Sequence, residues 1–136
     1  MRLEQQDVRP FLERFGQFED GVITGLHLHL PRKPISDRTA SIDIQAMDLS
    51  MEGEWRLVRI VVLGVAEYQF RASEEFSYNI LSDGAKLHCS DDRCVLDLDP
   101  GPDEWSPNAV AMNGEYGKQY VIGRCCGYEV LDGPFI

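Results

Sequence analysis

The chain has 136 residues, the length of one domain, and its 23 acidic side chains outnumber 13 Lys and Arg to give a net charge of −10. Such a charge repels nucleic acid and anionic membranes, since both are themselves negative. No stretch reaches the roughly 18 apolar residues that a membrane span requires. We therefore expect a single domain, residues 1–136, whose natural counterpart is a basic protein.

The N-terminal region predicts one short helix. Asp7 can accept hydrogen bonds from the first N–H groups of a helix, and Gly16 can end it. Between them, Phe11, Leu12 and Phe15 recur at helical spacing and form an apolar stripe. The first 14 residues contain no apolar core of signal-peptide length, so we expect the cytoplasm, where cysteines stay reduced.

The next 50 or so residues predict strands. Apolar and polar side chains alternate over residues 22–30 and 41–49, and a third strand is expected over residues 55–65. A basic, proline-containing loop, residues 31–38, separates the first two segments. Residues 60–63 are all apolar, which is typical of a strand that is covered on both faces.

Residues 66–98 predict an antiparallel meander of four strands, in which the apolar side chains lie on one face, with Leu81 and Val95 as the exceptions. Asp83-Gly84 is a strong two-residue hairpin signal and would pair Ile80 with Leu87. Asp91-Asp92 is a weaker signal of the same kind, with a register that pairs Cys89 with Cys94 and Leu87 with Leu96. The expected apolar face consists of Ala66, Tyr68, Phe70, Phe76, Tyr78, Ile80, Leu87, Cys89, Cys94, Leu96 and Leu98.

The C-terminal region predicts a loop and a last strand. Residues 100–107, PGPDEWSP, hold three prolines, and we expect Trp105 within them to be exposed. Asn113-Gly114 is another hairpin signal, and a strand follows from residue 118 to 124 or on to 130. About eight strands and one helix predict a mainly β (α+β) fold, an antiparallel β-sandwich or half-open barrel with a short N-terminal helix.

Two histidines offer a candidate metal site. His27 and His29 lie on the same side of a predicted strand, about 6.6 Å apart at Cα. A small β-barrel that binds a metal or small ligand through this pair is our alternative hypothesis. Pro31 and the basic residues after it supply no acidic ligand, however, and solvent-exposed histidines are the simpler interpretation.

No other pattern indicates a cofactor or an active site. The acids from Asp97 to Asp103 lack the glycine and glutamate positions of a helix-loop-helix calcium site. Cys125-Cys126 lacks the spacing of zinc or redox motifs, so structural thiols are expected there. Cys89 and Cys94 face each other at disulfide range, but reduced, buried thiols are favoured. We expect no cofactor and no enzymatic activity.

The acidic side chains of the meander and of the loop after it form the candidate binding surface. Their charge suits a basic protein partner, and an aromatic residue among charges is typical of an interface anchor. A homodimer formed through Trp105 or the edge of the last strand is a further hypothesis. The candidate partner-binding residues are Asp91, Asp92, Asp97, Asp99, Asp103, Glu104 and Trp105.

Four short elements of the sequence carry a family resemblance. They are Phe15-Gly16 followed by Phe18-Glu19-Asp20, the strand end Val62-Leu63-Gly64-Val65, Asn79-x-Leu81, and a closing strand from Tyr120 to Cys125. In these elements the chain resembles small bacterial immunity proteins of polymorphic toxin systems, whose members usually have Phe-His-Asp where this chain has Phe18-Glu19-Asp20. The resemblance implies a cytosolic protein that binds a cognate toxin and blocks it.

Overall fold

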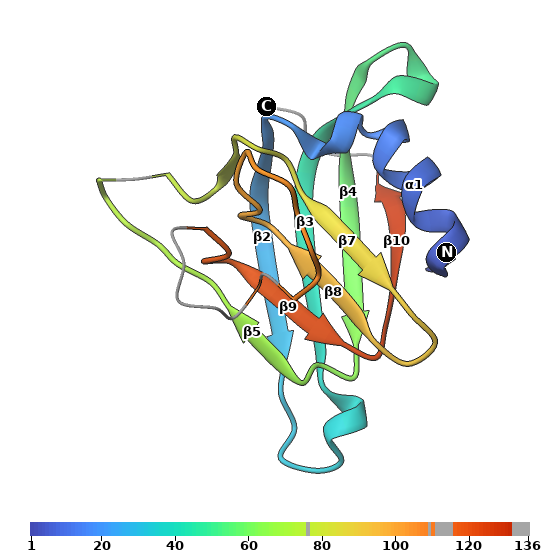
Figure 1. Ribbon diagram of the computed structural model, residues 1–136, viewed down its shortest axis with the longest axis vertical. Helices are drawn as coiled ribbons and strands as arrows, with labels where there is room; N and C mark the ends of the chain where they lie inside the picture. The colour runs from blue at the N-terminus through green and yellow to red at the C-terminus, as the bar shows by residue number, and fades with distance from the viewer. Residues whose placement is uncertain (76, 109, 111–115, 132–136) are drawn as a thin grey trace.

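Two antiparallel sheets pack face to face in the computed structural model, which describes residues 1–75, 77–108, 110 and 116–131. The larger sheet has the strand order β1-β10-β4-β3-β2-β6 and the smaller one β5-β9-β8-β7. Figure 1 shows the smaller sheet crossing in front of the larger one, with α1 beside β10. The expected antiparallel sandwich with a short N-terminal helix is confirmed.

Most of the regular structure is in the larger sheet. Its strands are β1 (Arg2–Leu3), β2 (Gly21–His29), β3 (Thr39–Asp48), β4 (Glu54–Leu63), β6 (Ile80–Leu81) and β10 (Cys125–Leu131). The smaller sheet consists of β5 (Glu67–Gln69), β7 (Lys86–Cys89), β8 (Cys94–Asp97) and β9 (Tyr120–Gly123). The helical segments are α1 (Gln5–Arg14) and the single turns η1 (Gly16–Phe18), η2 (Ile35–Asp37) and η3 (Leu49–Met51). None of the described helices has the length and apolar character needed to cross a membrane.

The N-terminal half follows the sequence pattern with two corrections. The helix begins at Gln5, because Glu4 rather than Asp7 is its N-cap and the Asp7 carboxylate instead accepts a hydrogen bond from the Glu4 N–H at 3.0 Å. In β4, Ile60 and Val62 are buried, but Leu63 is 44% exposed. The apolar run therefore does not mark a strand covered on both faces, because no second layer formed by the described residues covers Leu63.

The predicted four-stranded meander does not form. Only its β7–β8 hairpin is confirmed, with Cys89 opposite Cys94 and Leu87 opposite Leu96. Ile80 belongs instead to β6, which pairs with β2 in the other sheet, and this side chain is 46% exposed. Phe76, which was expected on the shared apolar face, lies outside the described residues, as does the Asn113-Gly114 signal.

The hairpin expected at Asp83-Gly84 does not form, because the Gly84 N–H donates to the Leu81 carbonyl at 3.0 Å and the turn is centred on Ser82 and Asp83. Gly84 has a positive φ of 74°, as a tight turn requires. The turn closes against η1 and does not pair two strands, because the Ala85 N–H donates to the Gln17 carbonyl at 2.9 Å. A Cβ atom on Gly84 would lie 2.3 Å from that same carbonyl oxygen, so only glycine fits. The chain uses this contact to pass from one sheet to the other.

The predicted last strand is in fact two strands. β9 pairs with β5 and β8 in the smaller sheet, whereas β10 pairs with β4 and β1 in the larger one. The change occurs at Arg124, whose N–H donates to the Leu63 carbonyl at 2.9 Å. β10 therefore lies inside the larger sheet between β4 and β1. These two strands occupy both edges of β10, so its edges are not free for the homodimer contact that was one of the hypotheses.

An aromatic cluster attaches α1 to the sandwich. Phe11 and Phe15 of the helix and Phe18 of η1 are buried, with ring centroids 5.4–5.5 Å apart. Tyr128 of β10 joins them at 4.4 Å from Phe11. Burial of each large aromatic ring stabilises the fold by roughly 2–3 kcal/mol, so the helix is an integral part of the core.

A buried ion pair holds the end of α1. The Arg14 guanidinium donates two hydrogen bonds to the Asp48 carboxylate at 3.0 and 3.1 Å, and Ser50 donates two more. Burial raises the pKa of Asp48, but the hydrogen bonds from Arg14 and Ser50 outweigh it and hold the pKa below 3.8. The pair therefore stabilises the fold above pH 4 and loses its effect as the pH falls through the lowered pKa.

Replacement of Asp48 by Asn should lower the free energy of unfolding at pH 7 by about 3 kcal/mol, because Arg14 loses its charged partner. The difference from wild type should shrink on acidification, as measured by urea denaturation between pH 7 and pH 3. Asp37→Asn, at an exposed position in η2, is the matched control and should leave stability almost unchanged. Equal losses in the two variants would contradict this assignment.

Candidate functional site

The predicted acidic surface is divided between two ends of one hairpin. Asp91 and Asp92 are exposed at its tip, between β7 and β8. Asp97 and Asp99 lie at the far end of β8, beyond a strand about 13 Å long. The expected residues therefore do not form one continuous patch.

Asp97 is not available to a partner, because it is only 1% exposed. One carboxylate oxygen accepts a hydrogen bond from the Trp105 indole N–H at 2.9 Å, and the other accepts one from the Asp99 N–H at 2.8 Å. The physical reason is that the loop of residues 100–108 brings Trp105 back over the outer face of β8 and β9. Asp97 is thus the internal anchor of this loop, and its assignment to the binding surface was wrong.

Trp105 helps to cover a second, smaller core. Val95, Tyr120 and Ile122 point away from the main core and are buried, and the half-buried Trp105 ring packs against them. The expectation of a freely exposed Trp105 was therefore wrong, since its ring lies on apolar neighbours and its N–H is used internally. The sequence signal was ambiguous, because an aromatic residue among acids is typical of an interface and also of a loop that closes over a core.

Exposed carboxylates remain around the end of the sandwich where β6 turns into β7. Burial raises the pKa of the half-buried Asp99, and the neighbouring charge of Asp83 adds to this effect, although Lys118 and Arg71 partly offset it. Glu19 lies beside the turn at Gly84. We call the exposed carboxylates at this end and on the adjoining loop the acidic end, which consists of Glu19, Asp83, Asp103 and Glu104.

The two histidines are placed as expected, on β2 and exposed. Their partners in register on β3 are Ser41 and Thr39, which carry no charge. Asp43, the next acid along that strand, is held by Arg59 at 2.7 and 3.0 Å. Within the described ranges, the structure brings no third metal-ligating side chain to this pair.

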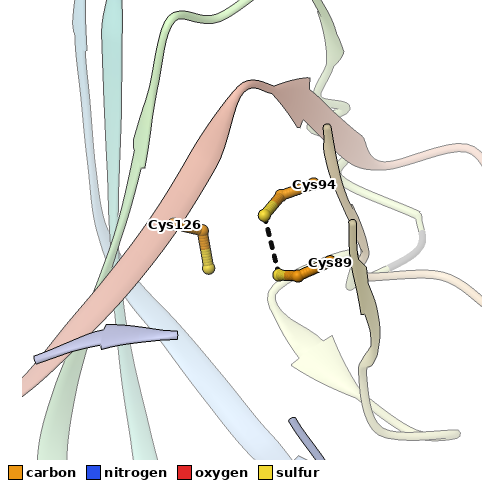
Figure 2. Close-up of side chains that lie close together, drawn as sticks. All are labelled: Cys89, Cys94 and Cys126. Atoms are coloured by element: carbon orange, nitrogen blue, oxygen red, sulfur yellow. Dashed lines mark hydrogen bonds between the residues drawn. The ribbon is translucent and has the colours of Figure 1, made fainter. Parts of the chain in front are cut away.

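A group of three buried thiols was missed by the sequence analysis. Cys89 and Cys94 come from the β7–β8 hairpin, and Cys126 projects toward them from β10 in the opposite sheet (Figure 2). A hydrogen bond of 2.7 Å joins the Sγ atoms of Cys94 and Cys89, and all three Sγ atoms lie within 4.8 Å of one another. We call these residues the thiol cluster. Each is at most 2% exposed.

The thiols of the cluster shift each other's pKa values. Hydrogen bonds with Cys126 and then Cys89 lower the pKa of Cys94 to about 4, against the effect of burial, and the charge of Arg2 adds to the lowering. At Cys89, contact with Cys126 lowers the pKa, but the Cys94 hydrogen bond and burial outweigh it and raise the pKa to about 12. Cys89 and Cys94 also raise the pKa of Cys126. The three thiols therefore do not titrate independently of one another.

The buried carboxylate of Asp97 should be visible by fluorescence. Burial raises its pKa above 3.8, although hydrogen bonds from the Asp99 N–H and Trp105 lower it in part. In a Trp55→Phe background, acidification should change the emission of Trp105 with a midpoint above pH 3.8, and Asp97→Asn should abolish this transition. Asp103→Asn, at an exposed neighbour, is the control that should retain it.

The same raised pKa predicts how stability depends on pH. A carboxyl group that binds its proton more tightly in the folded state destabilises the fold as it ionises. The stability of the wild type relative to Asp97→Asn should therefore fall as the pH rises from about 4 through the raised pKa. A difference that increases over that range in urea denaturation would contradict the prediction.

Comparisons of the chain with protein-family models, with curated proteins and with solved structures found no match to it.

Proposed function

We propose that this chain is a non-enzymatic, cytoplasmic binding protein that holds a basic protein partner against its acidic end. The observation that supports the proposal is a set of exposed carboxylates on one rigid sandwich that form no ion pair with any described residue. These are Glu19, Asp83, Asp103 and Glu104.

Two of the less exposed acids, Asp48 and Asp43, are neutralised by nearby arginines. Arg14 binds Asp48 in the fold interior, and Arg59 binds Asp43 on the outer face of the larger sheet. The excess of negative charge is consequently concentrated on exposed groups such as those of the acidic end. An excess of this kind accelerates encounter with a positive surface and disfavours negative ones.

The particular role we propose is that of an immunity protein, which neutralises a basic toxin by covering its surface. The resemblance to such proteins is carried mainly by positions that build the fold. Phe15 and Phe18 lie in the aromatic cluster, and Gly16 has a positive φ of 60° between them. The Asn79 amide donates to the Ile23 carbonyl at 3.3 Å and attaches β6 to β2. Shared positions of this kind support a shared scaffold, whereas the acidic end would give this chain its own partner.

A toxin encoded beside this chain is the sharpest test. The probe is the basic C-terminal domain of a large secreted protein from the neighbouring reading frame, mixed with this chain in stopped-flow measurements at low and high salt. The Asp83→Lys/Asp103→Lys variant should associate at least about tenfold more slowly at low salt, with a smaller difference at high salt.

Two double variants of equal charge change are the controls. Asp37→Lys/Glu54→Lys alters exposed acids in η2 and at the start of β4, and we expect only a small effect on the association rate. Asp91→Lys/Asp92→Lys shows whether the hairpin tip also meets the partner. Equal slowing in all three variants would show that net charge, and not the acidic end, controls association. The absence of any complex would reject the toxin as partner.

A further inference from the structure

We propose that the thiol cluster of Cys89, Cys94 and Cys126 binds a single thiophilic metal ion, either Zn(II) or Cu(I), through three sulfur ligands. The inference is independent of the acidic end. It starts from the convergence of three side chains from two different sheets on one buried point, which Figure 2 shows.

The spacing of the sulfur atoms fits one metal ion. Three sulfurs at the usual metal–sulfur distance of about 2.3 Å form a triangle with edges of about 4 Å. The observed edges start at 2.7 Å, between Cys89 and Cys94, and none exceeds 4.8 Å. Small side-chain rotations would therefore be enough to give three equal distances around a central ion.

The strands that carry the ligands hold them in place. Cys89 and Cys94 are directly opposite each other across the β7–β8 hairpin. Cys126 is paired on both sides, with Val62 of β4 and Leu3 of β1. Sites built on strands are more precise than sites built on loops, because backbone pairing fixes the direction of each side chain. A bound ion would also join the two sheets directly.

The chemistry of the ligands selects the kind of metal. Among the described residues the cluster contains sulfur alone, and thiolates favour Zn(II) and Cu(I) over the oxygen-seeking Mg(II) and Ca(II). The three cysteines are at most 2% exposed, so water has little access to the site, which suits an ion that is bound by few ligands. The nearby Arg2 would offset part of the negative charge left by three thiolates.

Surface hollows give a route to the buried sulfurs. One is lined by Arg2, Ser90, Asp91 and Cys94, between the first residues of the chain and the hairpin tip. A second hollow, beside α1, reaches Cys89. A hydrated ion could therefore reach Cys94 through the hollow beside the short strand β1.

Metal titration of the reduced protein under anaerobic conditions tests the proposal. Zn(II) and Cu(I) are added separately, each in competition with a chromophoric chelator, and Cd(II) serves as a spectroscopic probe. We expect one ion per chain, a thiolate-to-metal absorption band in the ultraviolet, and a higher melting temperature with the preferred ion. X-ray absorption should count three sulfur neighbours, a measurement that requires no variant.

Cys125 provides a matched control, because it precedes Cys126 in β10 and is half-buried but is not among the sulfurs that lie within 4.8 Å of one another. Cys126→Ala should weaken binding at least about a hundredfold, since it removes one of three ligands, whereas Cys125→Ala should bind as the wild type does. If Cys126→Ala fails to fold, Cys94→Ala serves the same purpose from the other sheet. Equal weakening by the Cys125 and Cys126 variants would overturn the proposal.

Two further outcomes would also overturn it. One is the absence of uptake of any of the three metals at micromolar concentration by fully reduced protein. The other is a Cys89–Cys94 disulfide in protein isolated from a reducing cytosol, seen as an intact mass lower by two hydrogens. In that case the cluster is a redox pair with Cys126 as a neighbour and holds no metal.

Discussion

The structure depends on the crossing between β9 and β10, where the chain leaves the smaller sheet and enters the larger one. β9 and β10 are separated only by Arg124, yet they lie in opposite layers. The crossing is tight, because a Cβ atom on Gly123 would lie 2.5 Å from the Val62 side chain, and the Arg124 N–H is bound to Leu63. The two sheets are thus joined covalently at Arg124, close to β8 and β10. This short connection fixes the position of β10 relative to β8.

The outer face of the smaller sheet decides which acids can reach a partner. That face carries Val95 and Ile122, which require a cover, and the loop that supplies Trp105 also draws Asp97 inside. A carboxylate in the middle of an apolar cover costs free energy unless donors satisfy it, and here two N–H groups do so. Some of the negative charge therefore serves the architecture, and only the remaining exposed part is available for recognition.

Sequence reasoning succeeded where structure is local and failed where partners are distant. Alternation placed β2, β3 and β4 to within two residues, and the Asp91-Asp92 turn gave the correct register for its hairpin. The partner of β5 could not be inferred, because β9 lies some 50 residues further on and many registers satisfy an alternating pattern.

The candidate sites follow the same division. The exposed positions of Asp91, Asp103 and Glu104 agree with their loop context. The burial of Asp97 depends on a loop whose path no local pattern specifies. Cys126 was missed for a related reason, since its distance from Cys94 is set by how two sheets stack and not by spacing in the sequence.

The pairing of β1 with β10 has a consequence for biosynthesis. Arg2 and Leu3 pair with Gly127 and Cys126, so β1 has no strand partner until β10 has been made. Contacts of such long sequence separation slow folding, because most of the chain has to be ordered before they form. On the ribosome, the Cys89–Cys94 hairpin emerges before Cys126, which leaves both sulfurs open to nascent-chain chemistry until β10 has been made.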